Sequence, residues 1–218
     1  MVQTIITLCI VASGICWSIV YLKSIHIGFT EHTYAMPLFA LGLNIVWEGL
    51  YAFTDLFIRQ SIGAQAIANA AWFCLDIFIL YTYFKYAREE CQSETERRFF
   101  VPWTVLSLAC CLVLQLLFYF YFGNVEGEKY SAYLQNIIMS ICYLYMLHDR
   151  RSSRGQSMVI AVCKMVGTLT PTIYGTLEGN MFILVTGIVC FAFDMIYIFA
   201  LREVIRREKA GELEGASA

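Results

Sequence analysis

The chain has 218 residues and a formal net charge of −2, and 59% of its residues are hydrophobic while only 15% are charged. A mean hydropathy of +0.63 is well above that of soluble domains and indicates a protein solvated largely by lipid. Because Lys and Arg do not outnumber Asp and Glu, no basic surface is expected, and nucleic-acid binding is excluded as a function class.

Apolar runs long enough to cross about 30 Å of hydrocarbon as helices recur along the chain. They are continuous and do not alternate with polar residues, so they predict an all-α integral membrane protein, a bundle of seven transmembrane helices, and not a closed barrel. The expected spans are Val2–Leu22, Tyr34–Ile58, Gln65–Tyr83, Val101–Phe122, Tyr130–Leu147, Ser157–Tyr174 and Met181–Leu201. With no long linker, we expect one domain over 1–205 and a polar, flexible tail over 206–218.

Basic residues outside these spans fall mostly on one side of the membrane. One side holds Arg59 and Lys129. The other holds Lys23, Lys85, Arg88, Arg97, Arg98, Arg150, Arg151, Arg154, Arg202, Arg206, Arg207 and Lys209. The excess predicts a cytoplasmic C-terminus and an N-terminus outside, on the lumenal side, and it arises only if the number of spans is odd.

The sequence gives little support for metal or nucleotide chemistry. Eight of the nine cysteines lie inside spans without a C-x-x-C pair, and the three histidines lie near the predicted cytoplasmic boundary. The P-loop, G-x-G-x-x-G, nucleophile-elbow, H-E-x-x-H and D-D-x-x-D patterns are absent. We therefore expect no metal and no cofactor.

Charged residues inside the spans are the strongest functional signal, because a charge near the bilayer centre costs about 2.5 to 3.5 kcal/mol and usually marks a site. The five are Glu48, Asp55, Asp76, Lys164 and Asp194. Asp55 lies near the outer interface, where water can hydrate it, and Lys164 can snorkel or pair with a carboxylate. For Asp76 two interpretations stay open, a structural partner of polar groups or of Lys164, and a functional residue.

Glu48 lies near mid-membrane in the second span. Helical spacing puts it on one face with Asn44, Tyr51 and Asp55, and Trp47 lies at the edge of that face. Because polar groups avoid lipid, this face is expected to point into the bundle.

The third and last spans carry similar faces. Trp72 aligns with Asp76, and Asp194 aligns with Tyr197. We expect Glu48 and Asp194 to open into one cavity reached from the cytoplasmic half, where desolvation keeps both carboxyls protonated. A neutral carboxylic acid in a dry pocket is a Brønsted acid ready to donate its proton.

Aromatic residues make up 16% of the chain, and most are expected to pack the core or line the membrane interfaces. Some lie beside the carboxylates, where ring faces can stabilise a carbocation that water would otherwise quench. These are Trp47, Tyr51, Trp72, Tyr174 and Tyr197.

Several motifs together resemble a known family. They are Tyr34-Ala-Met-Pro-Leu, Asn44-x-x-Trp47-Glu48-x-x-Tyr51, Trp72-x-x-x-Asp76 and Phe193-Asp194-x-x-Tyr197. In these motifs, in length and in helix count, the chain resembles the small seven-helix integral-membrane terpene cyclases of fungal meroterpenoid and indole-diterpene pathways, the pyripyropene and paxilline type.

The resemblance implies a metal-independent cyclase, of isomerase or lyase type, that protonates the terminal epoxide of a hydrophobic epoxy-prenyl substrate and drives carbocation polycyclisation. In that family a glutamate on the second helix and an aspartate on the seventh are the essential acids, and they correspond to Glu48 and Asp194. We expect Glu48 to be the proton donor, and Asp194 to be a co-acid or to position the oxygen. Supporting or substrate-binding roles are expected for Asn44, Trp47, Tyr51, Trp72, Asp76, Tyr174 and Tyr197. A eukaryotic member is expected in the endoplasmic reticulum membrane.

Two other function classes also place polar groups at mid-membrane. A proton-coupled small-molecule transporter is the main alternative, but the two halves of the chain show no matching motifs. A retinal or ligand receptor would be expected to carry a Schiff-base lysine on its last helix, whereas Lys164 lies on the sixth span and the last span carries Asp194.

Overall fold

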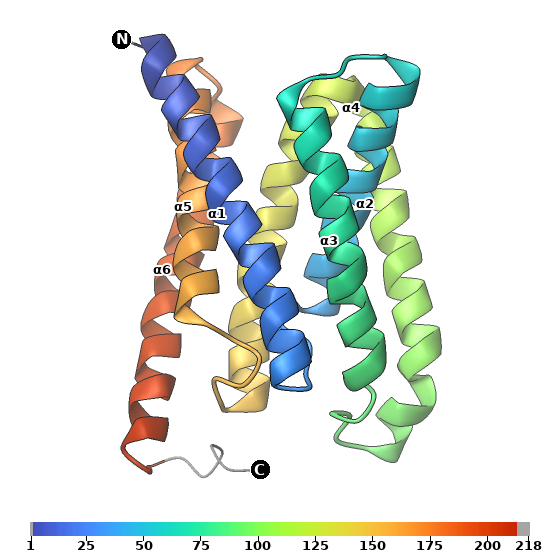
Figure 1. Cartoon of the computed structure of the whole chain (residues 1–218), viewed down its shortest axis with the longest axis vertical. Coiled ribbons are helices and arrows are strands. Elements are labelled where there is room, and N and C mark those ends of the chain that lie inside the picture. The colour runs from blue at the N-terminus through green and yellow to red at the C-terminus, as the bar shows by residue number, and fades with distance from the viewer. Residues whose placement is uncertain (1, 213–218) are drawn as a thin grey trace.

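A computed structural model describes residues 2–212, which form an all-helical bundle without strands among them (Figure 1). Its helices are α1 (Val2–Thr30), α2 (Leu38–Phe53), α3 (Ala64–Tyr86), α4 (Glu94–Arg150), α5 (Met158–Leu177) and α6 (Met181–Lys209), and the π-helical turn η1 (Thr54–Ile58) extends α2. Of the tail predicted over 206–218, residues 206–209 belong to α6 and 213–218 lie outside the described residues.

In the described part of the chain, six helices are long and apolar enough to cross a membrane, one fewer than predicted. The difference arises in α4, which contains both the predicted fourth and the predicted fifth span. Hydropathy also misplaced several helix ends, because it marks the limit of the hydrocarbon and not of the helix. Thus α1 continues to Thr30, and α2 begins only after Pro37, whose ψ of 141° is extended.

α4 reverses direction at Gly123, whose φ of 75° and ψ of 178° are not helical and are readily adopted only by glycine. In a straight helix, residues 115 and 135 would lie about 30 Å apart. Instead, Gln115 Nε2 donates to Gln135 Oε1 at 2.8 Å. The first arm (94–122) and second arm (124–150) therefore form an antiparallel hairpin, seen in Figure 1 as the light green and yellow helices on the right and in the middle.

The second arm of α4 lies between two groups of helices. Figure 1 shows α5 and α6 on one side of it and α2, α3 and the first arm on the other, while α1 starts beside α5 and crosses toward α3, where Tyr21 stacks on Trp72. α2 is the most enclosed helix: 61% of the residues in its most apolar 18-residue segment, which includes part of η1, are buried, against 17% in α1. Large apolar side chains such as Leu106 and Phe120 are exposed on the outside, as expected for a surface that faces lipid. The polar residues of α2 are therefore held inside the bundle.

Candidate functional site

The inner face of α2 carries Asn44, Glu48 and Tyr51, which are 3%, 1% and 0% exposed. This is the face that the helical spacing predicts. Asp55, which was predicted on the same face, lies beyond the end of α2 in η1. There it pairs with Arg59 at 2.9 Å and accepts a hydrogen bond from Asn124. Asp55 therefore belongs to one end of the bundle and not to the central cluster.

Glu48 lies in a polar cluster built by four helices. Tyr21 of α1 donates its hydroxyl hydrogen to Glu48 Oε1. Asn44 Nδ2 lies 3.1 Å from the same oxygen and 2.9 Å from Asp76 Oδ2 on α3. Gln135 Nε2, on the second arm of α4, donates to Asn44 Oδ1 at 3.3 Å and so fixes which way the Asn44 amide points. We call Tyr21, Asn44, Glu48, Asp76 and Gln135 the acid cluster.

The acid cluster holds two buried carboxyls and no counter-charge. Glu48 Oε2 and Asp76 Oδ1 make no hydrogen bond with the described residues, and no lysine, arginine or histidine among them forms an ion pair with either side chain. Two adjacent carboxylates in a dry interior repel each other, so the pair is more stable when it holds at least one proton. The arrangement is that of a Brønsted acid with one free oxygen on each carboxyl.

Asp194 has a different environment. Its Oδ1 lies 2.7 Å from Lys164 Nζ on α5 and accepts from Ser140 Oγ at 2.8 Å, and both charged side chains are buried. The dry pocket expected around Asp194 therefore contains a counter-charge at contact distance, which the sequence analysis did not assign to it. Lys164 is paired and does not snorkel, and it pairs with Asp194 and not with Asp76.

Glu48 and Asp194 do not touch each other in the described chain, although one shared cavity was expected. The second arm of α4 connects their surroundings, since Gln135 binds Asn44 and Ser140 binds both Asp194 and Lys164. These two arm residues lie about 7.5 Å apart along the helix axis at about 1.5 Å per residue. The structure thus brings Glu48 together with Asp76, and places Asp194 in a neighbouring ion pair.

Three of the predicted aromatic residues surround the acid cluster. The Trp72 ring stacks on Tyr21, with ring centroids 5.9 Å apart and 17° between the planes. The Trp47 and Tyr51 rings lie 5.5 Å apart on α2, within one turn of Glu48. Trp72 thus contacts the acid cluster through the Tyr21 ring, whereas the indole N–H of Trp47 donates to the backbone carbonyl oxygen of Glu128 at 3.0 Å.

The other two predicted aromatic residues lie apart from it. Tyr197 is three residues from Asp194, but its hydroxyl donates to Gln156 Oε1 at 3.0 Å and its ring contacts Tyr143. Tyr174, on α5, is half-buried and stacks on no other ring in the described chain.

Tyr21, Gln135 and Ser140 are the site residues that the sequence analysis did not identify. Gln135 and Ser140 are uncharged polar residues inside an apolar span, and this is a signal that a search limited to charged residues overlooks. Tyr21 carries no such signal, because tyrosine is common in membrane helices and α1 has no distinct polar face.

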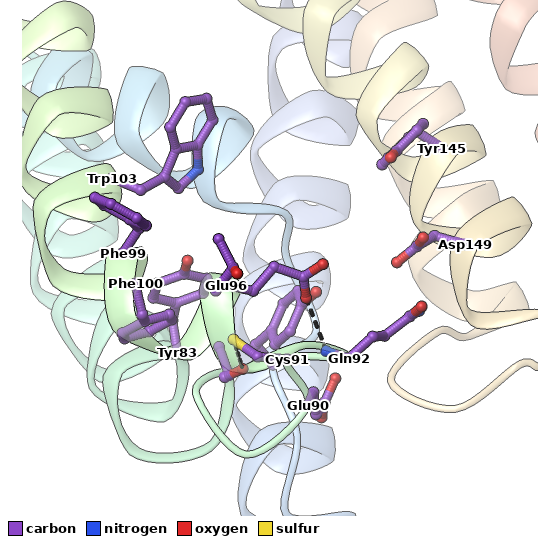
Figure 2. Close-up of a pocket in the computed structure, with 13 residues that line it drawn as sticks. Tyr83, Glu90, Cys91, Gln92, Glu96, Phe99, Phe100, Trp103, Tyr145 and Asp149 are labelled. Atoms are coloured by element: carbon purple, nitrogen blue, oxygen red, sulfur yellow. Dashed lines mark hydrogen bonds between the residues drawn. The ribbon is translucent and has the colours of Figure 1, made fainter.

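A pocket of ≈ 470 Å³ opens at the end of the bundle where α3 joins α4 (Figure 2). Its walls come from the end of α3, the α3–α4 loop, the first turns of α4 and the last turns of its second arm. The acid-cluster residues do not line it. Among the described residues, no group of three or more His, Cys, Asp or Glu side chains is arranged to hold a metal ion.

Comparison with known proteins gives one consistent result. Residues 1–207 match the family of Pyr4-like transmembrane terpene cyclases. The terpene cyclase pyr4 of Aspergillus fumigatus is 26% identical, over 95% of this chain and 90% of its own length. The Pyr4-family terpene cyclase mfmH of Annulohypoxylon moriforme is 28% identical over 92% and 86%, and the terpene cyclase andB of Emericella variicolor is 25% identical over 80% and 73%. No solved structure matches.

Proposed function

The chain belongs to the Pyr4-like transmembrane terpene cyclases, and from this membership we propose that it protonates the terminal epoxide of an epoxy-prenyl substrate, a meroterpenoid or related compound, and drives its polycyclisation. The observation that carries the proposal is the buried pair of Glu48 and Asp76, which has no cationic partner among the described residues. A transporter, the alternative from the sequence, is not favoured, because the relatives are named terpene cyclases.

In the proposed reaction, Glu48 gives its proton to the epoxide oxygen. The adjacent carbon–oxygen bond breaks as the neighbouring alkene attacks that carbon, and each further ring closure moves the positive charge along the chain. The rings of Trp47, Tyr51 and Trp72 stabilise the charge, and loss of one proton from carbon ends the cascade, so substrate and product are isomers. The proton supplied by the side chain replaces the Lewis acid that a metal would provide, so the proposed step is metal-independent.

Asn44 and Asp76 support Glu48 in this scheme. Asn44 donates toward both carboxyls and keeps them next to each other. Asp76 shares the proton with Glu48 before the reaction, and the proton lost from carbon at the end of the cascade goes back to the Glu48–Asp76 pair and restores the acid. Asp194 acts as a positioning residue, because its pairing with Lys164 and Ser140 holds the second arm of α4, which also carries Gln135.

The proposal includes the topology. The two arms of α4 each cross the membrane, which gives seven transmembrane helices in one domain over 1–205. The distribution of Lys and Arg then puts the N-terminus on the lumenal side and the C-terminus in the cytoplasm, in the endoplasmic reticulum membrane of a eukaryotic cell.

Incubation of microsomes with a terminally epoxidised prenyl meroterpenoid tests the function. Wild type is expected to give a product of unchanged mass and altered chromatographic mobility. Glu48→Gln should lower turnover by about a hundredfold or more, because a positioned general acid contributes about 10² to 10⁴. Glu89→Gln, an exposed glutamate in the loop after α3, is the matched control and should leave turnover unchanged. Cyclisation that survives Glu48→Gln would refute the assignment, and uptake of a solute into vesicles without product would favour transport.

A further inference from the structure

The pocket at the α3–α4 end of the bundle has the size of a small-molecule site, since such sites range from about 300 to 1,000 Å³, and its walls combine aromatic rings with carboxylates. Aromatic rings from separate segments line its ≈ 470 Å³. Tyr83 closes the inner side, stacked on Phe100 with centroids 5.5 Å apart. Trp103 and Tyr145 stand on the two arms of α4 (Figure 2) and are 62% and 68% exposed, so they border the pocket where it opens.

The charged side chains that line the pocket are all carboxylates, those of Glu90, Glu96 and Asp149. Glu90 forms an ion pair with Arg150 at 2.8 Å, and Glu96 accepts a hydrogen bond from the backbone N–H of Gln92 at 2.7 Å. Asp149 makes no hydrogen bond or ion pair with the described residues, and in Figure 2 it lies on the second arm, across the pocket from the α3–α4 loop. A ligand that fits these walls has a ring to stack on the aromatic side chains and hydroxyl groups to donate to the carboxylates, and it carries no negative charge.

The position of the pocket relates it to the acid cluster. Tyr83 and Asp76 lie seven residues apart on the same buried face of α3, which is about 10 Å along the helix axis. This separation is within the length of a prenyl chain, and Tyr83 is the lining residue that stands between the pocket and the acid cluster on α3. The pocket lies at an end of the bundle, where an amphipathic molecule can keep its polar part in water and its chain in hydrocarbon.

We propose that this pocket binds the hydroxylated ring at the head of the substrate, while the epoxidised end of the prenyl chain reaches Glu48. The inference rests on the proposed function, and it adds a second site that selects the substrate by its head group. Asp149 accepts from a ring hydroxyl, and Trp103 and Tyr145 hold the ring between them.

Two substrates separate head-group binding from the chemistry. One is resorcinol carrying a terminally epoxidised farnesyl chain, and the other is the methyl ether of the same chain without the ring. Tyr145→Leu and Asp149→Asn should each raise KM for the resorcinol compound about tenfold, the effect of losing one good contact, and change KM for the ring-free ether by less than about twofold. Tyr121→Leu, an 81% exposed tyrosine far along the first arm, is the control and should alter neither value. Equal effects on both substrates, or no effect on either, would overturn the proposal.

A binding measurement makes the test independent of turnover. Cys91 lines the pocket, and the other eight cysteines lie within the transmembrane helices, so a membrane-impermeant maleimide reports mainly on Cys91. In the Glu48→Gln protein, the resorcinol compound should slow Cys91 labelling about tenfold at saturation while the ring-free ether does not, and Asp149→Asn should weaken this protection. Absence of protection by the resorcinol compound would overturn the pocket assignment. If the resorcinol compound protects Cys91 but the wild-type protein cyclises neither compound, the binding role of the pocket is supported and the proposed cyclase mechanism is refuted.

Discussion

Replacing Lys164 by methionine tests the buried ion pair. In the native protein the Lys164 ammonium and the Asp194 carboxylate are 2.7 Å apart, with side chains 0% and 2% exposed, so water cannot replace the lost partner. Removal of one member of such a pair costs about 3 to 5 kcal/mol, whereas replacement of both by apolar residues is often neutral. We therefore expect Lys164→Met to lower the free energy of unfolding by about 3 kcal/mol or more, and Lys164→Met with Asp194→Leu to recover most of that loss.

The assay is equilibrium unfolding in mixed detergent micelles, followed by the helical circular dichroism signal. Lys129→Met is the matched control, because Lys129 and Glu126 form an ion pair 3.3 Å long with side chains 39% and 43% exposed. Its loss should cost no more than about 1 kcal/mol. The reasoning is refuted if Lys164→Met is as mild as Lys129→Met, or if the double variant is no more stable than Lys164→Met alone.

The same double variant separates the proposed positioning role of Asp194 from the direct roles expected from the sequence, as a co-acid or as the residue that positions the oxygen. A positioning residue can be replaced together with its partner, so the double variant should keep cyclisation within about tenfold of wild type, whereas Asp194→Asn alone should lose much more because it leaves the Lys164 charge unpaired. If the stable double variant has no activity, Asp194 takes part in the chemistry directly.

Three further outcomes follow from local features. Tyr21→Phe removes the hydroxyl that donates to Glu48 and should lower kcat about tenfold with KM nearly unchanged, as measured by steady-state turnover. Partial burial raises the pKa of the Cys91 thiol, so maleimide labelling should increase with pH beyond the range of an ordinary thiol, and a profile that levels off near pH 8.5 would contradict this. Gly123→Ala should cost about 1 to 3 kcal/mol in unfolding, while Gly63→Ala, at a φ of −103°, should not.

Much of the fold could be predicted because each span is a local property of the chain. Twenty apolar residues in sequence specify a membrane helix whatever lies beside it. The polar residues Glu126, Glu128 and Lys129 lower the hydropathy between the two arms of α4 and so separated the fourth and fifth predicted spans. Composition does not reveal that the backbone stays helical through these residues and leaves the helical conformation at Gly123.

In the candidate site, too, the features that belong to a single helix could be predicted, and those that depend on packing between helices could not. The spacing of Asn44, Glu48 and Tyr51 is a property of one helix, and it correctly indicated the buried face of α2. Which carboxyl faces which partner depends on how separate helices pack. For that reason the sequence placed Glu48 with Asp194, whereas the packing places Glu48 beside Asp76 and gives Asp194 a lysine partner.

The position of the pocket, apart from the acid cluster, has a consequence for how the family can diversify. Side chains such as Trp103 and Asp149 stand at the edge of the bundle and tolerate replacement, whereas Glu48 and its neighbours are enclosed on all sides. If the pocket binds the substrate ring and Glu48 donates the proton, as proposed, mutations at the edge change which molecules bind without disturbing the proton donor. Exchanging the edge residues between relatives is accordingly a direct route to cyclases that accept new substrates.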